Sequence, residues 1–107
     1  MSPRRPLNSD GPLDGLIHEA SRLKIVAVLS ECEQCDFNFL LGMAQLTRGN
    51  LSAHVAKLVA AGYVEEEKRF VDRKPNTRYR LTSAGRAAYN DYLAAWRRLT
   101  GQSTERR

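Results

Sequence analysis

The spacing of apolar residues changes twice along this 107-residue chain, from a helical period to a strand period and back again. Before Gly62, apolar side chains recur every three or four residues, as on one face of an α-helix. Over residues 63–81 they alternate with polar ones, and after Thr82 the helical spacing returns. Because about 100–200 residues make one domain, this order predicts one mainly α domain with a β-hairpin, an α+β fold.

The segment from residue 13 to residue 30 is expected to begin with a turn and to continue as a helix. Asp14 can cap a short helical turn that presents Leu16 and Ile17, and Ser21 is the expected N-cap of the next helix. That helix carries apolar residues at helical spacing from Leu23 onward. Whether the segment is one kinked helix or two is left open at this point.

Two further helices are expected, each after a residue type that commonly caps helices. Asp36 precedes a short amphipathic helix, and Thr47 precedes a helix over residues 48–61. Gly62 then supplies the glycine that helix C-termini favour. The expected buried face of the second of these helices carries Leu51, Val55, Leu58 and Val59.

A β-hairpin with a basic tip is expected over residues 63–81. Val64 and Phe70 share one parity in its first strand, and Thr77, Tyr79 and Leu81 alternate with arginines in its second. Between the strands, residues 72–76 contain turn-forming residues and two cations. Three glutamates at 65–67 oppose phosphate binding along the stem, so we assign phosphate contact to the tip.

The last helix is expected to begin after Thr82 and to reach about Thr100. One face of it carries a stripe of large side chains, namely Tyr89, Tyr92, Leu93, Trp96 and Leu99. Such a stripe either covers the core of the monomer or, where it is left open, forms an association patch. Because so small a chain has little else to cover this face, we expect a twofold dimer through the helix.

Basic residues exceed acidic ones, with 17 Lys and Arg against 12 Asp and Glu and a pI near 9.6. Residues 1–12 carry a net charge of +1, residues 13–62 carry −1, residues 63–81 carry +2 and residues 82–107 carry +3. A basic excess favours anionic partners such as nucleic acid or membrane surfaces. The sequence shows no basic amphipathic anchor, which favours nucleic acid over a membrane.

Several classes of protein are disfavoured. No apolar stretch approaches the roughly 18 residues of a spanning helix, and the N-terminus lacks the apolar region of a signal peptide. Two cysteines are too few for a disulfide scaffold, so we expect a cytoplasmic protein. No catalytic or cofactor motif is found, so we expect neither an enzyme nor a cofactor. Residues 1–12 are expected to form a flexible arm and residues 101–107 a polar tail.

The expected helix over residues 48–61 has an outer face suited to a DNA groove. The side chains opposite its apolar face are small or polar, namely Gly49, Asn50, Ala53, Lys57 and Ala60, with Ser52 and His54 on the flanks. A small face permits close approach to the floor of the major groove, where Asn, Ser and Lys can meet base edges or phosphates. Gly49 also lies in the first turn, where the helix dipole and free N–H groups favour an anion.

Four short motifs follow one another from this helix to the last one. They comprise Thr47, Gly49, Asn50, Leu51, Ser52, His54 and Leu58, then Ala61, Gly62, Tyr63 and Val64, then Arg73, Lys74, Pro75 and Thr77, and finally Leu81, Thr82, Gly85 and Arg86. Together they resemble the small winged-helix transcriptional regulators near the MarR and ArsR groups. The resemblance covers about residues 13–100, and its specificity comes from the combination of motifs.

The resemblance implies a winged helix-turn-helix domain with a recognition helix at about 48–61, a wing at about 63–81 and a C-terminal dimerisation helix at about 83–100. It implies a homodimer, usually a repressor, that binds double-stranded DNA at a palindromic operator. The recognition helix would enter the major groove, and the wing would contact the backbone or minor groove. No effector is indicated. The candidate DNA contacts are Arg48, Asn50, Ser52, Ala53, His54, Lys57, Arg73, Lys74, Asn76 and Arg78.

Cys32 and Cys35 lie just before Asp36, and this C-x-x-C-D segment is similar to the C-x-C-D metal-sensing segment of ArsR proteins but one residue longer. One pair of thiols supplies only two of the four ligands of a closed zinc site, so we expect incidental thiols and no metal. His54 is expected to donate to a phosphate or a base. Two alternatives are a winged-helix protein-interaction module without DNA binding and a metal- or thiol-responsive sensor of the same fold.

Overall fold

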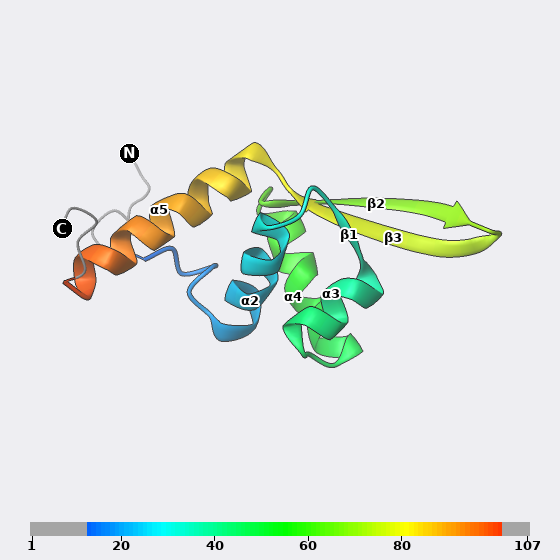
Figure 1. The fold of residues 1–107 in the computed structure, drawn as a ribbon, viewed down its shortest axis with the longest axis horizontal. Coiled ribbons are helices and arrows are strands. Elements are labelled where there is room, and N and C mark those ends of the chain that lie inside the picture. Colours follow the sequence, from blue (N-terminus) through cyan, green and yellow to red (C-terminus); the bar gives the residue numbers. More distant parts are fainter. Residues whose placement is uncertain (1–12, 102–107) are drawn as a thin grey trace.

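The computed structural model describes residues 13–101, which form a helical cluster and a three-stranded antiparallel sheet (Figure 1). The elements in chain order are α2 (Ala20–Ser30), β1 (Cys35–Asp36), α3 (Phe37–Ala44), α4 (Arg48–Ala60), β2 (Val64–Val71), β3 (Lys74–Leu81) and α5 (Ser83–Leu99). The predicted α+β fold, a winged helix-turn-helix with a C-terminal helix, is confirmed. The predicted arm, residues 1–12, and residues 102–107 of the predicted tail lie outside the described residues.

One hydrophobic core joins the three helices α2, α3 and α4 to the base of the hairpin. Its members include Ile25, Val26, Leu29, Leu40, Leu51, Val55, Leu58, Val64, Tyr79 and Leu81. The predicted buried face of α4 is confirmed, because Leu51, Val55 and Leu58 are at most 2% exposed and Val59 packs against the same cluster. This burial holds α4 in place and turns its opposite face to solvent.

Three of the predicted helix caps are present. Asp36 Oδ1 accepts a hydrogen bond from Phe39 N at 2.8 Å, and Thr47 Oγ1 accepts one from Asn50 N at 3.1 Å. Thr82 Oγ1 accepts from Gly85 N at 2.9 Å, so α5 begins where the sequence predicted. These short-range bonds satisfy backbone donors that the first turn of a helix leaves free.

The predicted cap of α2 is wrong by two residues. Asp14 does cap a turn, because its Oδ1 accepts from Leu16 N at 2.8 Å, and this turn ends at buried Ile17. The chain is then extended at Glu19, whose carboxylate accepts from Arg22 N at 2.8 Å, so that α2 begins before Ser21. Serine favours N-caps, which is why Ser21 was predicted as the cap. Because Ile17 is buried, the turn before α2 ends earlier, and Glu19 takes the N-cap position instead. The segment is therefore a turn followed by one separate helix.

The sheet has the strand order β1–β3–β2. Strand β1 was not predicted, since two residues are too few to show a period. It exists because Cys35 pairs with Tyr79 and Asp36 pairs with Arg78 on the free edge of β3. Strand β1 therefore fixes the start of α3 against the hairpin, because Asp36 is both a strand residue and the cap of α3.

The hairpin closes with a shorter loop than predicted. The five residues 72–76 were expected between the strands, but only Asp72 and Arg73 form the turn, with φ of 52° and 68°. Positive φ at both central residues is typical of a type I′ turn, whose twist matches the twist of paired strands. Lys74 consequently pairs with Val71 inside the ladder. The wing is therefore a long ribbon with a narrow tip, which extends beyond α3 and α4 (Figure 1).

Helix α5 leaves the hairpin through a close backbone contact and runs away from the wing tip (Figure 1). Thr82 N donates to Tyr63 O at 3.0 Å, and Thr82 Oγ1 donates to Gly62 O at 2.6 Å. A Cβ at Gly85 would lie 2.1 Å from Tyr63 O, so only glycine permits this approach. The glycine of the last sequence motif thus has a structural explanation.

Candidate nucleic-acid interface

The outer face of α4 is open to solvent. The five residues predicted for this face from the helical period are all exposed, namely Gly49, Asn50, Ala53, Lys57 and Ala60, and so are Ser52 on its flank and Arg48 at the start of the helix. A Cβ at Gly49 would meet nothing within 4 Å, so packing inside the protein does not require this glycine. Glycine in a helix costs up to about 1 kcal/mol relative to alanine, and no contact inside the described chain accounts for this cost at Gly49.

Arg48 lies at the first position of α4, close to the wing. Its Nη2 donates to Asn38 Oδ1 at 3.0 Å, and its guanidinium lies 5.5 Å from the centre of the Phe37 ring. Arg48 and Asn76 line the same hollow of about 230 Å³ between the start of α3 and the edge of β3. The structure therefore brings one predicted helix contact and one predicted wing contact together.

His54 is placed differently from the other candidates on α4. It is half-buried, and its Nδ1 lies 3.1 Å from Arg22 Nη1 and 3.8 Å from a carboxylate oxygen of Glu19. Both of these neighbours, the guanidinium of Arg22 and the carboxylate of Glu19, therefore face the Nδ1 side of the ring. Hydrogen bonding from Arg22 N lowers the pKa of Glu19, and nearby His54 and Arg22 also contribute. Contact between His54 and DNA stays a prediction.

The tip of the wing presents cations without a nearby acidic partner on the stem. Arg73 and Lys74 are exposed at the turn, whereas Asn76 and Arg78 are half-buried along β3. Arg78 Nε donates to Asn76 Oδ1 at 3.1 Å, which holds these two side chains together. The four predicted wing contacts therefore divide into an exposed pair at the tip and a mutually bonded pair on the strand.

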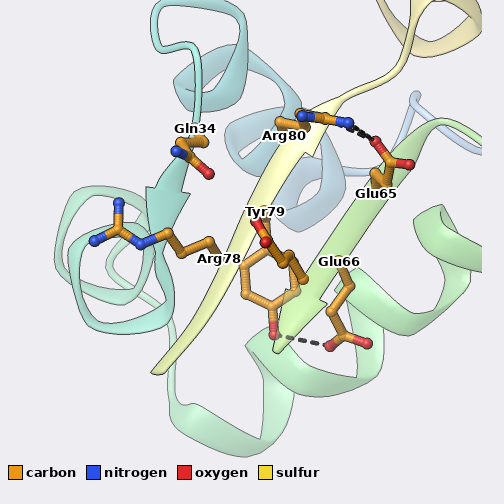
Figure 2. Close-up of a pocket in the computed structure, with 7 residues that line it drawn as sticks. Gln34, Glu65, Glu66, Arg78, Tyr79 and Arg80 are labelled. Carbon is orange, nitrogen blue, oxygen red and sulfur yellow. Dashed lines mark hydrogen bonds and ion pairs between the residues drawn. The ribbon is translucent and has the colours of Figure 1, made fainter. Parts of the chain in front are cut away.

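The glutamates of the stem are paired within the sheet. Figure 2 shows Glu65 bonded to Arg80 across the strands and Tyr79 directed to Glu66, whose oxygen its hydroxyl approaches to 3.2 Å. Glu67 accepts from Arg69 at 2.7 Å, and this bond lowers the pKa of Glu67. Pairing reduces the repulsion that the stem would exert on phosphates, which sequence alone could not show.

The stripe on α5 is not the open face that the sequence predicted. Tyr92 is only 4% exposed, because its hydroxyl lies 2.9 Å from His18 Nδ1 in the segment before α2. Trp96 and Leu99 are 43% and 56% exposed. A mainly apolar groove of about 620 Å³ runs between α5 and α2, and Tyr89, Tyr92, Leu93 and Trp96 help to line it. The inner part of the stripe thus covers the core, whereas Trp96 and Leu99 at the outer end of the stripe are exposed.

Cys32 and Cys35 are free thiols; Cys35 is buried in the first position of β1, and Cys32 lies three residues before it. Burial raises the pKa of Cys35 to about 11, with further contributions from Cys32 and Asp36. Metal binding and disulfide exchange both require the thiolate, which this environment disfavours. In residues 13–101, no three His, Cys, Asp or Glu side chains gather in a way that could hold a metal ion.

The part of the chain that the structure describes contains no helix long and apolar enough to cross a membrane.

A family model described as a winged helix DNA-binding domain matches residues 21–100. An uncharacterized protein of Methanocaldococcus jannaschii is 36% identical over 78 residues, which make up 73% of this chain and 85% of that protein.

Solved structures show the same architecture. A transcriptional regulator homologue from Pyrococcus horikoshii superposes with a TM-score of 0.76 at 26% identity, over 80% of this chain and 85% of that one. A MarR-family transcriptional regulator from Silicibacter pomeroyi superposes with a TM-score of 0.62, also at 26% identity, over 84% of this chain and 62% of that one.

The fold and the exposed α4 define a class, the winged-helix transcriptional regulators, which act by binding DNA and are not enzymes. This chain belongs to the winged helix DNA-binding domain family. The predicted resemblance to small regulators near the MarR group is confirmed. DNA is accordingly the partner of this chain, and its activity is binding.

Proposed function

We propose that this protein is a homodimeric transcriptional repressor that acts in the cytoplasm by occluding a palindromic operator. Each protomer inserts α4 into the major groove, with Asn50 and Ser52 at base edges and Lys57 near phosphate. The wing tip, Arg73 and Lys74, contacts the backbone beside it. The two half-sites lie about one helical turn apart, roughly 10 bp or a multiple of that distance.

The observation that carries this proposal is the common orientation of α4 and the wing. Ser52 and Ala56 of α4 and Glu66 and Tyr79 of the hairpin line one hollow of about 280 Å³. The exposed flank of α4 and one face of the wing therefore border the same side of the molecule. A duplex approaching that side meets a small polar helix face and a basic tip together, so specificity and affinity come from different elements.

The outer end of α5 supports the proposed dimer. Trp96 and Leu99 are exposed large apolar side chains, and Trp96 also lines a mainly apolar groove. Two copies related by a twofold axis would cover both grooves with one self-complementary contact. In this arrangement Trp96, Leu99 and Leu93 make the contact, while buried Tyr92 and half-buried Tyr89 support them from beneath.

Selection of sequences from a random duplex pool, followed by gel shift at several salt concentrations, tests the proposal. We expect recovered sequences to share a palindrome and to bind with a strong salt dependence, because phosphate contacts release counterions. Recovery of sequences without two related half-sites would contradict the dimeric mode. An absence of salt-sensitive binding to any duplex would contradict DNA recognition and favour a protein-interaction module.

A further inference from the structure

The wing carries a large apolar side chain that nothing in the described chain covers. Phe70 is 74% exposed, more than any other large apolar side chain in residues 13–101, although it shares a strand parity with buried Val64. It pairs with exposed Pro75 one step before the type I′ turn. In an antiparallel ladder closed by a two-residue loop this pair is non-hydrogen-bonded, so its side chains are close neighbours.

The exposure of Phe70 follows from the length of the hairpin. At the base, Val64, Tyr79 and Leu81 are buried against the helices. Phe70 lies six residues beyond Val64, about 20 Å further along the strand. The hairpin is therefore longer than the core that covers its base, and the side chain of Phe70 is left without apolar cover from residues 13–101.

The face that carries Phe70 is the face that borders α4. Glu66 has the same parity as Phe70 in β2, and Glu66 and Tyr79 line the hollow shared with Ser52 of α4. Phe70 lies four residues, about 13 Å, beyond Glu66 on that face. This offset is comparable with half of a DNA helical turn of about 34 Å, the distance from a major groove to the next minor groove.

The charge around Phe70 identifies the partner as a polyanion. Residues 68–75 contain Lys68, Arg69, Arg73 and Lys74 against Asp72, and three of these cations remain once Arg69 is paired with Glu67. A second copy of this wing would be repelled by the same cations. An apolar side chain among cations is the combination with which proteins enter the minor groove, the cations meeting phosphates and the apolar group meeting sugars and base steps.

We propose that Phe70 is a DNA-contact residue that enters the minor groove flanking the site read by α4. Pro75 forms the second apolar wall of this contact, and the cations of the tip hold the phosphates on either side. The inference rests on the proposed function, because it adds a residue to the same interface. It also assigns a contact to the wing that does not depend on charge.

The test compares Phe70→Ala with Val71→Ala on duplexes recovered by the wild-type protein from a random pool. Val71 is the matched control, since it is adjacent, 43% exposed and on the opposite face. We expect Phe70→Ala to weaken binding about tenfold at every salt concentration, because aromatic contacts with nucleic acid release no counterions. The salt slope should be unchanged, and Val71→Ala should bind as the wild type does.

Hydroxyl-radical footprinting, which reports on the minor groove, supplies the second measurement. Phe70→Ala should lose protection in the flanking minor grooves and keep protection around the two half-sites. Equal affinities of the two variants, or unchanged flanking protection, would overturn the inference and leave the proposed function standing. A change in oligomeric state of Phe70→Ala by sedimentation would identify a protein contact instead. Failure of the wild type to recover any duplex would overturn both proposals.

Discussion

Replacement of Gly85 with alanine should destabilise the junction between the hairpin and α5. The added Cβ would lie 2.1 Å from the carbonyl oxygen of Tyr63, and ordinary contact begins at 3.4 Å. The opposing atom belongs to the backbone, so no side-chain rotation can relieve the overlap. The first turn of α5 must therefore move away from residue 63 by about 1.3 Å.

The cost of this movement can be worked out from the contacts it breaks. Thr82 N donates to Tyr63 O at 3.0 Å and Thr82 Oγ1 donates to Gly62 O at 2.6 Å, and both bonds cross the junction. Losing one or both costs about 0.5–1.5 kcal/mol each, and overpacking costs about 1–3 kcal/mol. Alanine regains up to about 1 kcal/mol of helix propensity. The free energy of unfolding should fall by about 2–4 kcal/mol.

Urea unfolding followed by circular dichroism measures this change, and Gly42→Ala is the matched control. Gly42 is also a helical glycine, but a Cβ there meets nothing within 4 Å. Gly42→Ala should therefore raise the free energy of unfolding by about 0.5–1 kcal/mol, through propensity alone. The same substitution is expected to have opposite signs at two positions, and the melting temperature of Gly85→Ala should drop by at least about 10 °C.

The reasoning would be refuted if Gly85→Ala unfolded at the wild-type urea midpoint, or if it matched Gly42→Ala. Either result would mean that α5 shifts on the hairpin at negligible cost and that the junction is not a close-packed contact. A lower m-value without a lower midpoint would point instead to a change in the denatured state.

Three further predictions concern the proposed interface. Asn50→Ala and Ser52→Ala should each cost about 1–3 kcal/mol on selected duplexes and little on random DNA, and equal losses on both would contradict base readout. Arg73→Ala should weaken binding to all sequences and reduce the salt slope by about one, whereas an unchanged slope would remove the wing tip from the phosphate contacts. Trp96→Ala should shift sedimentation towards monomer, and an intact dimer would place the stripe in the monomer core.

Under the proposed function, the uneven charge of the chain would separate affinity from specificity. Residues 13–62, which contain α4, carry a net charge of −1, while the positive excess lies in the wing, the last helix and the termini. A nearly uncharged helix face discriminates bases by hydrogen bonding and fit. Cations at the periphery supply attraction that is independent of sequence and falls with salt.

Helix starts and the outer face of α4 were predictable because they depend on short-range geometry. Asp36, Thr47 and Thr82 cap helices through bonds to backbone three residues away. The exposed face of α4 follows from the 3.6-residue period once Leu51 and its neighbours are buried. No knowledge of distant parts of the chain is needed for either prediction.

The order of the helices and the hairpin, the caps of α3, α4 and α5, and the small polar face of α4 could therefore be predicted from the sequence. Tertiary structure alone decided the pairing of β1 with β3, the burial of Tyr92 against His18, and the placement of His54 beside Arg22. It also decided that Phe70 is exposed although its parity matches that of Val64. The physical reason is that such contacts join residues far apart in the chain, 74 positions for His18 and Tyr92, where local periods carry no information.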